Sequence, residues 1–110
     1  MTDDTATDPP PAWLDALAAE AERDIVFLWY VVQGRLGGPR VEASKVEALI
    51  EAVSRELIRR GCTVGFGDPG DPEWQTPPEF AVPLADLPAT IAQRWAAAPD
   101  VYGDLAFAIR

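Results

Sequence analysis

The chain has 110 residues, with 18 Asp and Glu against 9 Lys and Arg, and a formal net charge of −9. This length suits one domain with a single core, and the charge disfavours binding to nucleic acid or to anionic membranes. The chain has no histidine and one cysteine, which excludes the commonest general base, intrachain disulfides and paired-cysteine metal sites.

The first ten residues are acidic and proline-rich, so we expect residues 1–10 to form a disordered tail. They contain neither the basic nor the apolar region of a signal peptide. The longest apolar run, at 25–32, is too short to cross a membrane. These features predict a cytoplasmic protein.

A first helix is predicted from residue 11 to residue 34 or 36, because Pro11 fits a first helical turn and apolar residues then recur at helical spacing. Phe27, Trp29 and Tyr30 make this helix apolar on every side. Such a helix must be covered all round. We therefore expect it to be fully buried or to form a homodimer contact.

A second helix is predicted over residues 44–60. Ser44 and Glu47 have the spacing of a capping box, and Gly61 suits a left-handed C-terminal cap. Glutamate precedes arginine by four positions twice on this helix, an order that favours ion pairs. The predicted pairs are Glu51 with Arg55 and Glu56 with Arg60.

Beyond Gly61 the apolar period changes to two, which predicts a strand at 63–67. A proline-punctuated connection then runs over 68–80. Asp86 is a good N-cap for a third helix at 86–97, and alternation predicts a last strand at 104–110, paired with 63–67.

The order is therefore helix, helix, strand, helix, strand. It predicts a single α+β domain over residues 11–110, with three helices and a small two-stranded sheet. Two helices leading into a two-stranded ribbon resemble a winged-helix arrangement, although the helix between the two strands departs from the usual wing.

The stretch GFGDPG, at 65–70, has the G-x-G-x-x-G spacing of a dinucleotide-binding turn. Such a turn works because its last glycine leads into a helix whose N–H groups hold a pyrophosphate. Here Gly70 is followed by DPEWQTPPEF, whose prolines forbid that helix, and Asp68 and Asp71 would repel phosphate. We expect tight turns here and no cofactor.

Other chemical sites have weak signals. Asp68, Asp71 and Glu73 could offer oxygens to calcium but lack the calcium-loop pattern, so we expect no metal. A nucleophilic serine would need a neighbouring base. The candidate nucleophiles are Ser44, Ser54 and Cys62. Ser44 is best explained as a helix cap, and the C-terminus of the preceding helix is expected to raise the pKa of the Cys62 thiol. We predict a protein without enzymatic activity, with a small carboxylate-dependent enzyme as one alternative.

Recognition of DNA by the helix at 44–60 is disfavoured because its basic residues alternate with glutamates. Residues 61–93 contain no Lys or Arg, and acids alternate there with aromatics. This pattern is typical of a binder of basic surfaces, in which carboxylates steer and aromatics anchor. Alternatively, Trp74 and Phe80 fold back onto the core. The predicted partner-binding residues are Asp68, Asp71, Glu73, Trp74, Glu79 and Phe80.

Four stretches, DIVFLWYVV, LIRRGCTVGFGD, IAQRW and GDLAFAIR, lie within residues 24–110. In this layout the chain resembles small uncharacterised bacterial proteins, and in size and charge it is similar to immunity proteins. Such proteins neutralise toxic effectors by plugging a basic active site. The resemblance implies a basic protein partner and no particular site residues. A winged-helix-like regulator is the main alternative.

Overall fold

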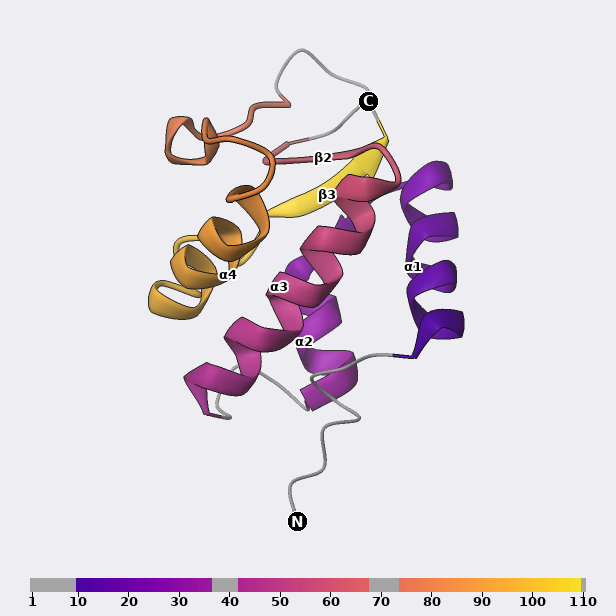
Figure 1. Ribbon diagram of the computed structural model, residues 1–110, viewed down its shortest axis with the longest axis horizontal. Helices are drawn as coiled ribbons and strands as arrows, with labels where there is room; N and C mark the ends of the chain where they lie inside the picture. The colour runs from indigo at the N-terminus through magenta and orange to yellow at the C-terminus, as the bar shows by residue number, and fades with distance from the viewer. Residues whose placement is uncertain (1–9, 37–41, 68–73, 110) are drawn as a thin grey trace.

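The computed structural model describes residues 10–36, 42–67 and 74–109 (Figure 1). Within them the fold is α+β, as predicted, but it has four α-helices and three strands where three and two were expected. The helices are α1 (Pro11–Arg23), α2 (Leu28–Leu36), α3 (Ala43–Arg59) and α4 (Leu87–Ala97), and a 3-10 helix, η1, covers Pro78–Phe80. The strands are β1 (Val26–Phe27), β2 (Cys62–Gly65) and β3 (Ala106–Ile109).

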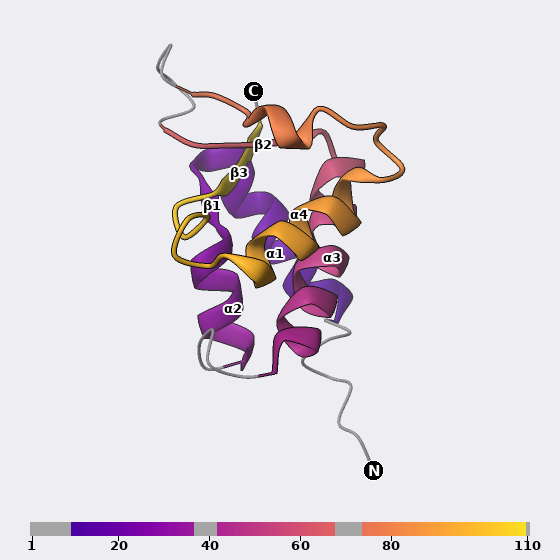
Figure 2. The ribbon, with the colours of Figure 1, turned by 90° about the vertical axis from the view of Figure 1, so that its left-hand side faces the viewer.

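The prediction of one long first helix is wrong. The helix stops at Arg23, and Val26 and Phe27 instead pair antiparallel with Phe107 and Ala106 of β3. β-Branched and aromatic residues are suited to an extended backbone, and the edge of β3 supplies the hydrogen-bonding partners that make it favourable here. The two-residue strand β1 therefore separates α1 from α2, and α2 is a separate helix rather than a continuation of α1 (Figure 2).

The sheet is antiparallel, and β3 lies at its centre between β1 and β2. The predicted pairing of the last strand with the strand after Gly61 is confirmed, with Val64 opposite Phe107. Because side chains alternate along a strand, Phe107 lies in the main core. Ala106 and Ala108 belong instead to a second small cluster, which also contains Trp74.

Helices α3 and α4 make the most extensive contact between two elements and contribute a large part of the main core (Figures 1 and 2). The predicted stripe of α4 is confirmed, since Leu87, Ile91 and Trp95 are all buried. Asp86 precedes that helix but makes no side-chain capping bond. The buried stripe of α3 also agrees with the sequence and consists of Val46, Leu49, Ile50, Val53 and Leu57.

The ends of α3 agree only in part with the prediction. The helix is preceded by Glu42, so Ser44 lies inside its first turn, exposed, and is not the cap. Glu42 can take this place because its backbone carbonyl accepts the first helical hydrogen bonds, from the N–H groups of Lys45 and Val46. At the other end, Gly61 has a φ of 97°, which confirms the predicted left-handed cap.

Candidate protein-binding groove

Three of the six predicted partner-binding residues, Trp74, Glu79 and Phe80, belong to the part of the chain that the structure describes. Asp68, Asp71 and Glu73 are outside the described residues, so their role stays a prediction. The two aromatics of the set, Trp74 and Phe80, are both buried, with 8% and 3% of their surface exposed. The interpretation of these rings as exposed anchors is therefore wrong, and the alternative that they fold onto the core is confirmed.

Trp74 is buried because small residues leave room for its indole on the outer face of the sheet. We call this place the Trp74 seat, formed by Gly65, Ala106 and Ala108. A Cβ atom at Gly65 would lie 2.7 Å from Cε2 of the indole. The backbones of Phe66 and Gln75 exchange two hydrogen bonds of 2.9 and 3.0 Å beside it. Gly65, the first glycine of the GFGDPG stretch, thus makes space for the Trp74 ring.

Phe80 and Glu79 belong to a second contact of the core. The Phe80 ring lies 5.7 Å from the ring of Tyr102, which also stacks on Phe66 at 6.3 Å. The hydroxyl of Tyr102 donates a hydrogen bond to the Glu79 carboxylate. This bond lowers the pKa of Glu79 and raises that of Tyr102. Glu79 therefore has a structural partner inside the chain.

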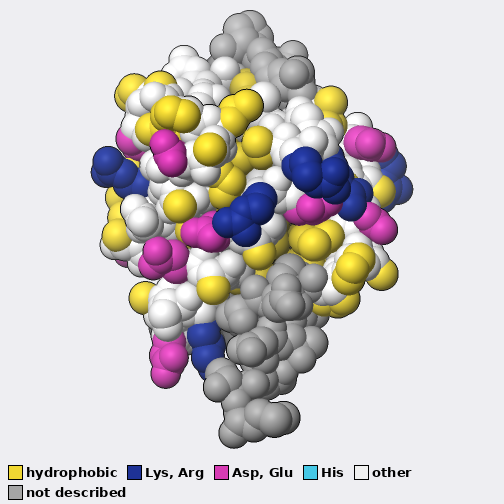
Figure 3. Space-filling model, viewed as in Figure 1, with side chains coloured by type: hydrophobic (Ala, Val, Ile, Leu, Met, Phe, Trp, Pro, Cys, Tyr) yellow, Lys and Arg dark blue, Asp and Glu magenta, His cyan; other side chains and the backbone are white. Residues whose placement is uncertain are grey.

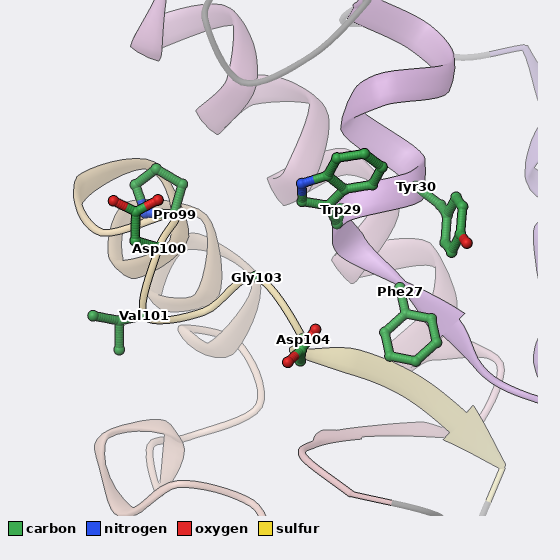
Figure 4. A pocket seen from close by; sticks show the side chains of 8 residues that line it. All are labelled: Phe27, Trp29, Tyr30, Pro99, Asp100, Val101, Gly103 and Asp104. Carbon is green, nitrogen blue, oxygen red and sulfur yellow. The ribbon is translucent and has the colours of Figure 1, made fainter.

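A different surface exposes aromatic side chains. We call it the aromatic groove, a cavity of about 550 Å³. Trp29 is 41% exposed and Tyr30 is 69% exposed, so full burial, the first of the two expected outcomes, is wrong, whereas the homodimer contact stays a prediction. Figure 4 shows the Trp29 indole between the Tyr30 ring and the turn at Asp100. The groove is lined by Phe27, Trp29, Tyr30, Pro99, Asp100, Val101, Gly103 and Asp104.

One wall of the groove comes from β1 and the start of α2. The break in the first helix leaves Leu28 fully buried and turns the next two residues outward. The exposed rings support each other: Trp29 meets Tyr30 edge-on with centroids 5.8 Å apart, and Phe27 lies 6.1 Å from Tyr30. Such geometries are favourable for aromatic pairs. The wall is therefore a preformed cluster of rings.

The other wall is the turn that joins α4 to β3. Backbone bonds hold it, since the N–H groups of Val101 and Tyr102 both donate to the Ala98 carbonyl, at 3.0 and 3.1 Å. Tyr102 points into the core, whereas Asp100 and Asp104 are exposed. Neither carboxylate forms an ion pair with any described residue. Within the described part of the chain, the turn thus presents two unpaired negative charges beside the rings.

The arginines in the C-terminal half of α3 and at its C-cap are paired, in contrast. The predicted pairs are confirmed, with Glu51 2.7 Å from Arg55 and Glu56 2.8 Å from Arg60. Arg59 also contacts Glu56, and these two arginines lower the pKa of Glu56 to about 2. On the face in Figure 3, positive side chains accordingly lie beside negative ones.

The candidate nucleophiles have no catalytic surroundings among the described residues. Ser54 is fully buried in α3. Cys62 is buried too, and the pKa of its thiol is raised as predicted, although the main cause is burial rather than the helix dipole. In the described ranges, no three acidic or cysteine side chains gather as a metal site would require. No helix there combines the length and apolar character needed to span a bilayer.

The sequence contained one signal for the groove. A single buried stripe cannot hold all three rings of Phe27, Trp29 and Tyr30. The break in the helix that exposes them, however, depends on pairing with the far end of the chain.

Comparison of the chain with protein-family models, curated proteins and solved structures finds no significant match.

Proposed function

We propose that this chain is a non-enzymatic module that binds a basic protein through the aromatic groove. Its concrete form would be an immunity or inhibitor protein that covers a cationic site on its partner. The observation that carries this proposal is the position of exposed Trp29 and Tyr30 beside the carboxylates of Asp100 and Asp104, which form no ion pair with a described residue. Tryptophan and tyrosine are enriched among residues that dominate binding energy, and aromatic faces attract cations.

Charge favours a basic partner over a second copy of the chain. Each copy carries a net charge of −9, and the groove itself has an acidic rim. Two such rims would repel each other on approach, whereas a basic surface would be steered toward them. A homodimer through α2 is therefore the competing outcome that the experiment must distinguish.

The winged-helix-like regulator remains the second proposal. It draws on α3 leading into β2, which pairs with β3 as an antiparallel ribbon. The ion pairs of Arg55, Arg59 and Arg60 weigh against direct DNA contact, because a DNA-reading helix needs unpaired basic side chains.

A carboxylate-dependent enzyme could use Asp100 and Asp104, but both are exposed to water. A cytoplasmic location accords with a single free thiol.

The test begins by capturing the partner with the wild-type protein and then measures association and dissociation rates at two salt concentrations. Asp100→Asn with Asp104→Asn should slow association and flatten its salt dependence, because long-range steering weakens. Trp29→Ala should mainly speed dissociation, with a loss of about 2 kcal/mol if it is a hot spot.

A matched control removes two charges away from the groove, by Glu22→Gln with Glu47→Gln. Both glutamates lie outside the residues that line the groove. If this control slows association as much as the groove pair does, net charge and not the groove governs encounter. Unchanged rates in folded groove variants would contradict the proposal, and sedimentation of the free protein as a dimer would favour the homodimer.

A further inference from the structure

A second depression lies on the other side of the same aromatic rings. Its volume is about 430 Å³, and it lies along α1, β1 and α2. Phe27 and Tyr30 line both this depression and the aromatic groove. The pair of rings, 6.1 Å apart, is therefore a ridge between two adjoining hollows.

The two hollows differ in chemistry. We call the second one the apolar depression, because Leu17, Ile25 and Val31 contribute to its lining. The acids of its lining, Glu20 and Asp24, are exposed, and Glu20 is already bonded to Arg23 at 2.8 Å. Asp24, like Asp100 and Asp104, forms no ion pair with a described residue, so the difference lies in the aliphatic side chains. Leu17, Ile25 and Val31 give the apolar depression a surface that suits an uncharged side chain, whereas the rings and two carboxylates of the aromatic groove suit a cation.

We infer that one segment of the partner crosses the Phe27–Tyr30 ridge, with a basic side chain in the aromatic groove and a bulky apolar side chain in the apolar depression. This inference rests on the proposed function and names the kind of segment that the site takes. A segment filling only the groove would leave the far side of the Tyr30 ring in water. A segment filling both hollows desolvates both sides of the ridge, and such fully desolvated rings dominate binding energy.

Gly34 gives a direct way to block the apolar depression. It lines the depression, lies in α2, and a Cβ atom built there meets no other atom within 4 Å. Its φ is not positive, so larger residues fit the backbone. Replacing a helical glycine by another residue also favours the helix. Gly34→Phe should therefore occupy the depression while the fold is kept, and Gly34→Ala is the matched control.

The probes are short random peptides displayed on phage and selected on the wild-type protein. We expect the enriched peptides to combine Arg or Lys with a large apolar residue. Their affinity should fall about tenfold on Gly34→Phe, which corresponds to about 1.4 kcal/mol, and should stay unchanged on Gly34→Ala. A peptide whose apolar residue is replaced by serine should bind wild type and Gly34→Phe equally.

The outcomes separate this inference from the proposed function. Peptides that depend on Trp29 but bind Gly34→Phe as tightly as wild type would overturn the two-hollow inference alone. Enrichment of basic peptides without an apolar residue would do the same. If selection yields no peptide whose binding requires Trp29 or the Asp100 and Asp104 carboxylates, both the inference and the proposed function are wrong.

Discussion

Trp74 and Trp29 occupy opposite situations in the same small domain. Trp29 comes from the apolar run at 25–32 and Trp74 from the acidic, proline-punctuated connection at 68–80, yet Trp74 is buried on the sheet and Trp29 is exposed on α2. Trp74 faces Gly65, Ala106 and Ala108, which have little or no side chain. Trp29 rests edge-on against Tyr30, itself exposed. Whether a ring becomes core or surface is decided by the size of the residues opposite it.

The comparison predicts its largest effect in the free energy of unfolding. Trp74→Ala should destabilise the protein by about 3 kcal/mol, because it empties the seat against the sheet. Trp29→Ala should cost less than about 1 kcal/mol, since that side chain is already partly in water. Urea unfolding of both variants and of wild type measures the difference.

Binding should show the reverse order. Trp29→Ala should weaken the complex with a basic partner, while a folded Trp74→Phe variant, which keeps a ring in the seat, should bind as wild type does. Equal losses of unfolding free energy for Trp29→Ala and Trp74→Ala would contradict the conclusion that Trp74 belongs to the core and Trp29 to the surface.

The sequence predicted much of the scaffold and little of the site. The apolar stripe of α3 and the pairing of Glu51 with Arg55 follow from spacings within one helix, so local reasoning finds them. The break at Val26 depends on a strand some eighty positions later (26 to 107). The helical spacing of apolar residues contains no information about that contact. Without the contact, the sequence places Trp29 in one long helix whose apolar faces must all be buried.

The sequence could not decide between the exposed and the buried position of Trp74 for a similar reason. Its seat consists of residues from β2 and β3 that only the sheet brings together. Small residues such as Gly65 and Ala106 carry weak signals in a sequence, because neither has a large apolar side chain whose period would mark a buried face. Only their joint placement under one indole shows that they are selected for size.

A smaller effect is expected at the floor of the seat. Gly65→Ala should cost about 2 kcal/mol of stability, because its methyl group would lie 2.7 Å from Trp74 Cε2 and 2.9 Å from the Gln75 carbonyl oxygen. Part of that cost should disappear when Trp74 is also replaced by alanine, since the ring no longer needs the space. A double-mutant cycle by urea unfolding measures the coupling. Additive losses would show that the indole does not depend on the glycine.

The carboxylates divide between the same two kinds of environment. Glu56 is held by Arg59 and Arg60 on α3, whereas Asp104 has no ion pair with any described residue. A carboxylate that is paired within the chain stabilises the fold, whereas a carboxylate without such a partner can bind another molecule. The contrast can be measured through the pH dependence of stability.

Glu56→Gln should give the smallest change, a loss of about 1 kcal/mol or less at neutral pH, because ion pairs with exposed arginines are weak. The folded pKa of Glu56, about 2, lies below the unfolded value of about 4.3. Its contribution is therefore complete above about pH 5 and is lost as the pH falls toward 2. Urea unfolding at neutral pH and near pH 2 should show wild type and Glu56→Gln converging in acid, whereas Asp104→Asn, which removes no ion pair with a described residue, should match wild type at neutral pH. A Glu56→Gln deficit that persists in acid would mean that packing of the side chain, and not its charge, supports α3.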